Sequence, residues 1–222
     1  MEQTQISSFA EIAEQYTRLI LEGDRGAAQH LVFGVLDQGA TVRDIYLKIF
    51  QPSLYEVGRQ WEAGQLSIAR EHLATAVTQS VLSSIYSRVS LPPHLSHHAV
   101  VACLSGNYHE IGPRMLADFL QMAGYNTRFL GSNTPIASVL ELIDELKPDV
   151  IGLPATTPEH VEAVRRTIEL LRADFNSYRP VIMVGGLAFN ASGDLWKRVQ
   201  ADLWGLDAGQ AVDRLTGGNK WG

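Results

Sequence analysis

The pattern of apolar residues changes near residue 92, and this change constrains the fold more than any other feature. Before it, apolar residues recur at three- and four-residue intervals, which is the spacing of an amphipathic helix. After it, short apolar runs typical of buried strands alternate with helix-like segments. A linker rich in proline, residues 91–96, separates the two patterns. We therefore expect a helical domain at 1–92 and an α/β domain at 97–222.

Four helical segments are predicted in the first domain, beginning near residues 8, 25, 41 and 67. Serine or threonine, which favour helix N-caps, stand near three of these starts. Pro52 is expected to kink or interrupt the third segment, because proline lacks the backbone N–H that a helix interior needs. A four-helix bundle that caps the second domain is the simplest arrangement of such segments.

The second domain is predicted to be a flavodoxin-like, doubly wound parallel sheet of five strands. The strand candidates are 98–104, 126–131, 149–153, 180–184 and 201–204. The helix candidates are 113–124, 134–146, 158–174, 190–199 and a last helix from about Asp207. Strands that alternate with helices of this length form a parallel sheet covered on both faces. Such folds bind their ligands beyond the carboxyl ends of the strands.

One loop carries the candidate site of the second domain. His109 lies between Gly106 and Gly112, shortly after the apolar run that ends at Leu104. This strand-to-helix loop should therefore stand at the ligand-binding edge of the sheet. Glycines there let the backbone approach a large planar partner closely. The residue types alone leave three roles open for His109: metal ligand, general base and surface histidine.

In this setting the loop resembles a known signature. Asn107-x-His109-x-x-Gly112 is similar to the Asp-x-His-x-x-Gly motif of cobalamin-binding domains. Later landmarks of that family follow in order: Pro154-Ala155-Thr156 in place of Ser-x-Leu, the pair Gly185-Gly186, and the last strand and turn around Trp204. The resemblance covers roughly residues 98–216. It implies that cobalamin is the cofactor and that His109 replaces the nucleotide base of the cofactor as the lower cobalt ligand.

The resemblance also places the displaced nucleotide tail in a slot at the same edge. The small and hydroxyl-bearing residues expected to line it are Thr156, Thr157, Gly185 and Gly186. A tight strand-to-helix turn is the alternative explanation of the two glycines. Two positions depart from the family pattern. Asn107 replaces an aspartate that hydrogen-bonds the ligating imidazole and offers only an uncharged amide oxygen, and Pro154 replaces a serine, which removes a hydroxyl.

The helical half carries a second motif, in which nine residues separate Trp61 from Glu71-His72. A tryptophan at a bundle corner beside two exposed polar residues is the structural alternative. Next to a cobalamin-type domain, however, Trp-x9-Glu-His resembles the upper-face motif of cobalamin-dependent photoreceptors. The resemblance implies that Trp61 packs over the upper axial ligand and that Glu71 and His72 hydrogen-bond its polar atoms. Glu62 departs from some of these photoreceptors, in which a histidine at that position binds cobalt after illumination.

These resemblances together predict a light sensor that is not itself an enzyme. The expected cofactor is adenosylcobalamin, with methyl- and hydroxocobalamin as other forms, and loss of the upper ligand on illumination would change conformation or partner binding. The expected partner is a protein such as a transcription regulator, or a second copy of the chain. Two alternatives remain open: a corrinoid methyl carrier of a methyltransferase system, and a sensor of haem or another tetrapyrrole.

Composition argues against several other classes. A net charge of −6 disfavours direct nucleic-acid binding, which needs clustered Lys and Arg, and no apolar run reaches the ~20 residues of a membrane span. The single cysteine, Cys103, excludes an internal disulfide and is expected to be an inert core residue. The sequence begins near its first predicted helix, without a DNA-binding segment or secretory leader, so we expect a cytoplasmic protein that acts through a partner. The other histidines show no metal-ligand spacing: His30, His94, His97, His98 and His160.

Overall fold

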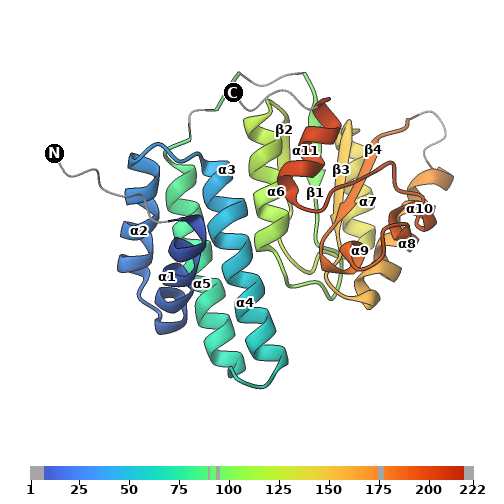
Figure 1. Cartoon of the computed structure of the whole chain (residues 1–222). Helices are drawn as coiled ribbons and strands as arrows, with labels where there is room; N and C mark the ends of the chain where they lie inside the picture. The colour runs from blue at the N-terminus through green and yellow to red at the C-terminus, as the bar shows by residue number, and fades with distance from the viewer. Residues whose placement is uncertain (1–7, 90, 94–95, 175–177, 218–222) are drawn as a thin grey trace. The chain divides into compact units, whose positions relative to one another are not determined.

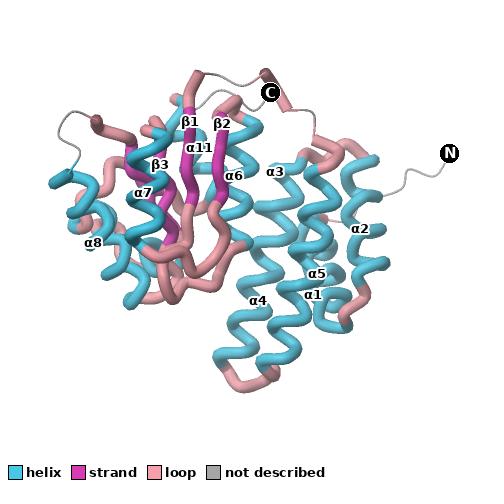
Figure 2. Tube along the Cα trace, turned by 180° about the vertical axis from the view of Figure 1, so that it is seen from behind, coloured by secondary structure: helices cyan, strands magenta, loops and turns pink. Residues whose placement is uncertain are grey.

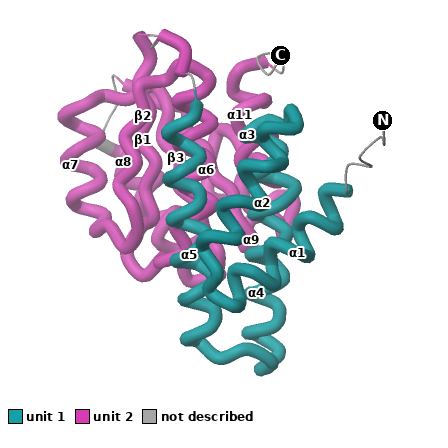
Figure 3. Tube along the Cα trace, turned by 90° about the vertical axis from the view of Figure 1, so that its left-hand side faces the viewer, with its two compact units in different colours: residues 1–90 teal, residues 91–222 magenta. Residues whose placement is uncertain are grey.

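The chain consists of two structural units, residues 1–90 and residues 91–222 (Figures 1 and 3). The computed structural model describes residues 8–89, 91–93, 96–174 and 178–217, and each unit is described by itself. His94, to which we assigned no metal role, lies outside these residues. No helix within the described ranges is long and apolar enough to cross a membrane.

Unit 1 contains helices and turns but no strand among its described residues. Its elements are α1 (Phe9–Glu22), α2 (Arg25–Asp37), α3 (Val42–Asp44), η1 (Ile45–Phe50), α4 (Gln51–Glu62) and α5 (Ile68–Tyr86). Helix α1 contacts α2, α4 and α5, and its buried Tyr16 donates a hydrogen bond to Thr78 Oγ1 of α5 at 3.3 Å. Ser8 and Ser67 cap α1 and α5 by accepting backbone N–H groups of the first turn, so polar side chains set where these helices begin.

Pro52 was expected to kink or interrupt the third helical segment, and the segment is not interrupted. Elements α3, η1 and α4 follow one another without a gap, and η1 is a π-helical turn in which the Gln51 N–H bonds to Tyr46 O. In a regular helix the proline ring would clash with the carbonyl four residues earlier. A π turn holds one extra residue, so placing it directly before Pro52 lets the helix continue. Ile49 and Phe50 of this turn are fully buried.

Unit 2 is a five-stranded parallel sheet with the strand order β2-β1-β3-β4-β5. Its strands are β1 (His98–Val101), β2 (Asn126–Phe129), β3 (Val150–Pro154), β4 (Val181–Gly185) and β5 (Leu203–Trp204). Its helices are α6 (Ile111–Met122), α7 (Ile136–Leu146), α8 (Pro158–Asp174), α9 (Leu187–Asn190), α10 (Leu195–Arg198) and α11 (Ala208–Thr216). This is the doubly wound, flavodoxin-like order that the alternation of strands and helices predicted.

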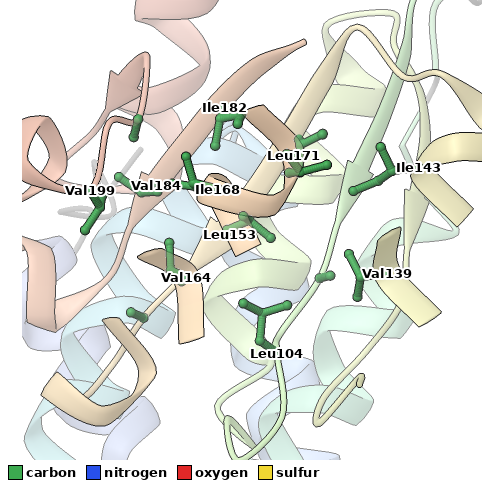
Figure 4. Close-up of a cluster of buried hydrophobic side chains, with 14 of the residues drawn as sticks. Leu104, Val139, Ile143, Leu153, Val164, Ile168, Leu171, Ile182, Val184 and Val199 are labelled. Carbon is green, nitrogen blue, oxygen red and sulfur yellow. The ribbon is translucent and has the colours of Figure 1, made fainter. Parts of the chain in front are cut away.

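Helices cover both faces of this sheet. Helices α6 and α11 lie on one face (Figure 1), and α7 and α8 lie on the other (Figure 2). On the first face a Cβ at Gly152 would lie 3.0 Å from Leu116 Cδ2 of α6, so glycine in β3 lets that helix approach. On the second face, side chains of α7 and α8 such as Val139 and Ile168 form the main apolar cluster with the strands (Figure 4).

The helix expected over 190–199 is instead two short helices, α9 and α10. Between them Ser192 donates its hydroxyl to Asp194 Oδ1 at 3.0 Å, and Gly193 follows Ser192 in the sequence. Short polar side chains and glycine are poor helix-interior residues, because they favour other backbone conformations. The segment is held by burial of Val199 in the apolar cluster rather than by helix propensity.

Candidate functional site

His109 lies in a loop at the topological switch point of the sheet. Strand β1 pairs with β2 on one side and with β3 on the other (Figure 2), and at such a point neighbouring loops diverge and leave a crevice. The run predicted as a strand over 98–104 is regular only to Val101, and an isolated bridge joins Leu104 to Thr134. After this bridge the chain turns outward, so His109 is exposed directly before α6.

The β2–α7 segment holds this loop from one side. The Gly106 N–H donates to Asn133 Oδ1 at 2.9 Å, and the Asn133 N–H donates to the Asn107 carbonyl oxygen at 2.9 Å. Gly106 has φ +86° and Asn133 has φ +54°, a left-handed conformation that glycine adopts freely and asparagine tolerates. Asn133 was not among the site residues that the sequence indicated. Its position four residues after the end of β2, at the same sheet edge, is the signal that could have found it.

Asn107 holds the loop from the β3 side. Its side chain is buried, with Nδ2 donating to Pro154 O at 3.1 Å and Oδ1 accepting from the His109 backbone N–H at 3.1 Å. A carbonyl can only accept and a backbone N–H can only donate, so these partners fix the orientation of the amide. Asn107 therefore anchors the backbone of His109, whereas the sequence had suggested an acceptor for its imidazole. It also bonds to Pro154, the other position that departs from the family pattern.

A second histidine lies beside His109, although the sequence gave it no role. The rings of His109 and His160 are 6.1 Å apart between centroids and inclined by 61°. His160 Nε2 lies 3.1 Å from Gly106 O, and the Thr157 N–H donates to His160 Nδ1 at 3.3 Å. The nitrogen that faces a carbonyl must carry the proton and the one that faces an N–H must not. His160 thus links the His109 loop to the start of α8.

The remaining loops of this edge have their own internal contacts. Thr157 directly precedes α8, and its hydroxyl bonds to Glu159 and holds the pKa of that carboxyl below its usual range. Thr156 is half-buried. Gly186 has φ +93°, and a Cβ there would lie 2.4 Å from Ala155 O, so the fold itself requires this glycine. At Gly185 a Cβ would approach Gly205 O to only 3.4 Å, so the need there is weaker.

Trp204 at the end of β5 is half-buried and engaged within its own neighbourhood. Its indole N–H donates to Asn190 Oδ1 at 3.2 Å, and Asn190 Nδ2 donates to Leu206 O at 2.7 Å. The Arg214 guanidinium lies 5.1 Å from the centre of the indole ring and donates to Trp204 O at 2.6 Å. These bonds tie the β5 loop to α9 and α11 and thereby shape the far end of the same edge.

Large exposed apolar side chains occur at several points along the carboxyl edge of the sheet. In the described part of unit 2 they are Tyr108 (68% exposed) in the loop after β1, Leu187 (45%) at the start of α9, and Leu206 (48%) in the loop after β5. Gly112, in the first turn of α6, is exposed, and a Cβ there would meet nothing within 4 Å. The fold does not require a glycine at this position. An open edge with apolar contacts and room above the helix suits a broad, flat ligand.

Within the described part of the chain, His109 does not belong to a ligand set that could hold a bare metal ion. No group of three or more His, Cys, Asp or Glu side chains among the described residues could hold a metal ion. Cys103, close by in the sequence, is buried, and burial together with the charge of Glu110 raises the pKa of its thiol to about 12. A single histidine can, however, complete the coordination of a metal that arrives inside a macrocycle. The donor set therefore fits the axial ligand of a corrin or haem.

Trp61, Glu71 and His72 belong to unit 1, where they flank the turn between α4 and α5. Trp61 is 46% exposed in the last turn of α4, whereas a tryptophan that served only to pack the bundle would be buried. Glu71 is half-buried near the start of α5, where Oε1 accepts from Thr75 Oγ1 at 3.0 Å and Oε2 lies 3.6 Å from His72 Nε2. The three residues share one end of the helical unit, and Glu71 and His72 interact with each other.

Similarity to known proteins extends over both units of the chain. One B12 binding domain model matches residues 97–213, and a second matches residues 12–86. The transcriptional repressor CarH of Myxococcus xanthus is 27% identical over 92% of this chain and 68% of its own length. The repressor CarA of the same organism is 35% identical over 75% of this chain, which spans only 54% of CarA.

Corrinoid proteins of methanogens are also similar, some of them along nearly their whole length. Trimethylamine corrinoid protein 1 of Methanosarcina acetivorans is 26% identical over 95% of this chain and 98% of its own. The solved monomethylamine corrinoid protein of Methanosarcina barkeri shares the fold, with a TM-score of 0.81 over 94% of this chain and 98% of that one at 17% identity. None of these names denotes a catalyst. With domain models matched along both of its halves, the chain belongs to the B12 binding domain family.

Proposed function

We propose that this protein is a cobalamin-binding light sensor that changes conformation or partner binding when the upper axial ligand is lost. The observation that carries cobalamin binding is the exposed His109 at the switch point, in a loop that hydrogen bonds hold on both sides and at a sheet edge that also bears exposed apolar side chains. Family membership favours a corrin over haem as the macrocycle.

The residues of unit 2 are assigned to the lower face and the nucleotide tail. His109 provides the lower ligand to cobalt, and the missing side chain at Gly112 gives the corrin room above α6. Tyr108 offers an exposed aromatic ring next to the ligand. Thr156, Thr157, Gly185 and Gly186 border the tail, and Trp204 closes that end of the edge. Asn107 contributes by holding the His109 backbone.

The residues of unit 1 are assigned to the upper face. An exposed tryptophan keeps a large apolar surface in contact with water, which is unfavourable unless a ligand covers it. A bulky upper ligand such as 5′-deoxyadenosyl is suited to cover Trp61. Glu71 and His72 provide acceptor and donor atoms for its hydroxyl and amine groups. When bound, an alkylcobalamin supplies a cobalt–carbon bond that visible light cleaves. The chain then loses the group that Trp61 covered, which biases it toward a second arrangement.

We propose that a transcription regulator is the partner that receives this signal. Loss of the upper ligand changes the conformation of the sensor and thereby its binding to the regulator. Support comes from the relatives named as repressors and from the Trp-x9-Glu-His motif, which resembles that of cobalamin-dependent photoreceptors.

The test is an absorption spectrum. The protein is purified in darkness with adenosylcobalamin, and its spectrum is recorded before and after green light, together with its elution volume. We expect a spectral change and a change in assembly or shape. His109→Ala should shift the dark spectrum toward that of free cobalamin. Trp61→Ala should alter the photoproduct or the choice of upper ligand, whereas Tyr55→Ala, an exposed aromatic residue elsewhere on α4, should not. The sensor proposal is refuted if light changes the spectrum of the bound cofactor no more than it changes the spectrum of free adenosylcobalamin.

A methyl carrier is the second candidate, and the end-to-end match to a trimethylamine corrinoid protein favours it. In this role the protein would present methylcobalamin to a methyltransferase. The discriminating assay supplies methylcobalamin-loaded protein, a thiol acceptor and a candidate methyltransferase in darkness. Stoichiometric transfer that depends on this protein would support the carrier, and its absence beside a strong light response would support the sensor.

A further inference from the structure

We propose that His160 is a positioning residue for His109. It holds the His109 imidazole in the orientation in which that ring binds the metal from one side of the corrin. The inference rests on the proposed cobalamin site and adds a residue that neither the sequence motif nor the family resemblance includes. Two features carry it: the double hydrogen bonding of His160 and the contact between the two rings.

The hydrogen bonds of His160 connect two loops. Its Nε2–H reaches Gly106 O at 3.1 Å, and the next residue, Asn107, fixes the His109 N–H. Its Nδ1 accepts the Thr157 N–H, a donor at the start of α8 that lacks a helical partner. Position 160 follows Thr157 by three residues, the spacing at which a capping-box side chain reaches back to the residue before a helix. Helix α8 thus supports the loop that carries His109.

The two ring nitrogens of His160 are in use, so His160 supports the site and does not bind the metal itself. Its Nδ1 lone pair points at an N–H, and its Nε2 carries the proton that the Gly106 carbonyl accepts. The ring is then presented to His109 at 61°, an edge-to-face arrangement that aromatic rings favour. An exposed histidine loses rotamer entropy when it binds a metal, and a neighbouring ring that already restricts it lowers this cost.

Asn107 cannot replace this support. The buried amide binds the backbone of His109 and the carbonyl of Pro154, so it positions the chain and leaves the imidazole to other contacts. Conserved partners around a metal ligand commonly supply such orientation. In this chain we assign that duty to His160, on the opposite side of the loop from Asn133.

The experiment asks which nitrogen lies on cobalt. Protein labelled with ¹⁵N-histidine is loaded with unlabelled cobalamin, reduced to the Co(II) state and measured by electron paramagnetic resonance, while the dissociation constant is titrated in parallel. A protein histidine on cobalt splits the axial lines into doublets, and the cofactor's own base splits them into triplets. The variants are His160→Ala, His160→Gln, His109→Ala and the control His98→Ala, an exposed histidine at the amino end of β1.

We expect doublets for the wild type and for His98→Ala, and none for His109→Ala. His160→Ala should mix triplet with doublet and bind cobalamin about tenfold more weakly, the usual effect of losing an outer partner of a metal ligand. His160→Gln keeps an N–H donor for Gly106 O and should recover most of the affinity and of the doublet. If His160→Ala does not fold, His160→Leu, which also removes both hydrogen bonds, takes its place and should show the same mixture of lines and the same loss of affinity.

Two results would overturn the proposal while leaving the cobalamin site intact. Equal spectra and affinities for the wild type and both His160 variants would show that His160 positions nothing. Doublets that persist in His109→Ala but vanish in His160→Ala would make His160 the ligand itself. A wild type that binds cobalamin with triplets only would instead refute the lower-ligand assignment of His109, and the inference with it.

Discussion

Replacing Asn107 with aspartate separates the structural role of this residue from the role of the acid in the family motif. In the structure Asn107 Nδ2 donates to Pro154 O at 3.1 Å and Oδ1 accepts from the His109 N–H. A carboxylate keeps the acceptor but places a charged oxygen against a carbonyl oxygen. Leaving a buried carbonyl unpaired costs about 1–3 kcal/mol, and the stronger bond from the His109 N–H to a carboxylate returns about 1 kcal/mol.

Because the carboxylate is also buried, and an unpaired buried charge adds to the cost, we expect a net loss of about 2 kcal/mol in the free energy of unfolding of the apoprotein. For a domain of this size such a loss lowers the melting temperature by about 4–8 °C. Circular dichroism during heating measures this shift. The scan is run without cobalamin, so that ligand binding does not mask the difference.

The penalty should also depend on pH, with a definite sign. Burial and the facing carbonyl raise the pKa of the new carboxyl above its unfolded value of about 3.9. The folded state then binds its proton more tightly than the unfolded state does, so acid favours folding of the variant. Relative to the wild type, the deficit is smallest below about pH 4, where the protonated group can donate to Pro154 O. It grows as the pH rises through the pKa of the folded state.

Asn133→Asp is the matched control. Asn133 is exposed, and its Oδ1 accepts from the Gly106 N–H at 2.9 Å, a bond that a carboxylate keeps. Its stability should therefore stay within about 0.5 kcal/mol of the wild type. If Asn107→Asp proves as stable as Asn133→Asp at neutral pH, the bond from Asn107 to Pro154 is not formed in solution and our account of the loop is wrong.

Four further predictions test other parts of the structure. Gly186→Ala should lower the free energy of unfolding by about 3 kcal/mol, because its backbone is accessible mainly to glycine and the new Cβ would meet a carbonyl oxygen at 2.4 Å. Denaturant titration measures this, and Gly193→Ala, which meets nothing within 4 Å, should be nearly neutral. Gly112→Ala should stabilise the apoprotein by up to about 1 kcal/mol, since alanine favours a helix, yet weaken cobalamin binding in a titration; unchanged affinity would place the corrin elsewhere. Cys103, whose thiol is buried with a pKa of about 12, should resist alkylation at mildly alkaline pH until denaturant is added, and rapid labelling of the native protein would contradict its burial. Trp61→Ala should lower the melting temperature less than removal of a fully buried aromatic side chain would, because Trp61 is 46% exposed, and a loss as large as that of a buried aromatic would favour the packing role over the ligand-covering one.

Local patterns explain how much of the fold could be predicted. Apolar runs and capping residues such as Ser67 act within a few residues of themselves, so the order of strands and helices in unit 2 followed from the sequence. The errors lie where local preference was overruled. Pro52 is accommodated by a π turn that the buried side chains of η1 stabilise, and the segment 190–199 is divided by Gly193 yet held by the burial of Val199.

Order along the chain was enough to predict one part of the site. The position of His109 after an apolar strand placed it at the carboxyl edge of a parallel sheet, and the motif that it forms with Gly112 and the later loops resembles that of cobalamin-binding domains. Likewise, the nine residues between Trp61 and Glu71 placed these two side chains on either side of a helix break.

The side chains that support His109 could be identified only from the folded chain. His160 is distant from His109 in the sequence, and it reaches the loop because β3 lies beside β1 and α8 begins at the same edge. Asn107 could be an acceptor for an imidazole or for a backbone N–H, and the position of Pro154 O settled the choice. Contacts of this kind depend on strand order and on the directions of hydrogen bonds between distant segments. For that reason the motif could be recognised in the sequence, whereas the residues that orient His109 could be recognised only in the folded structure.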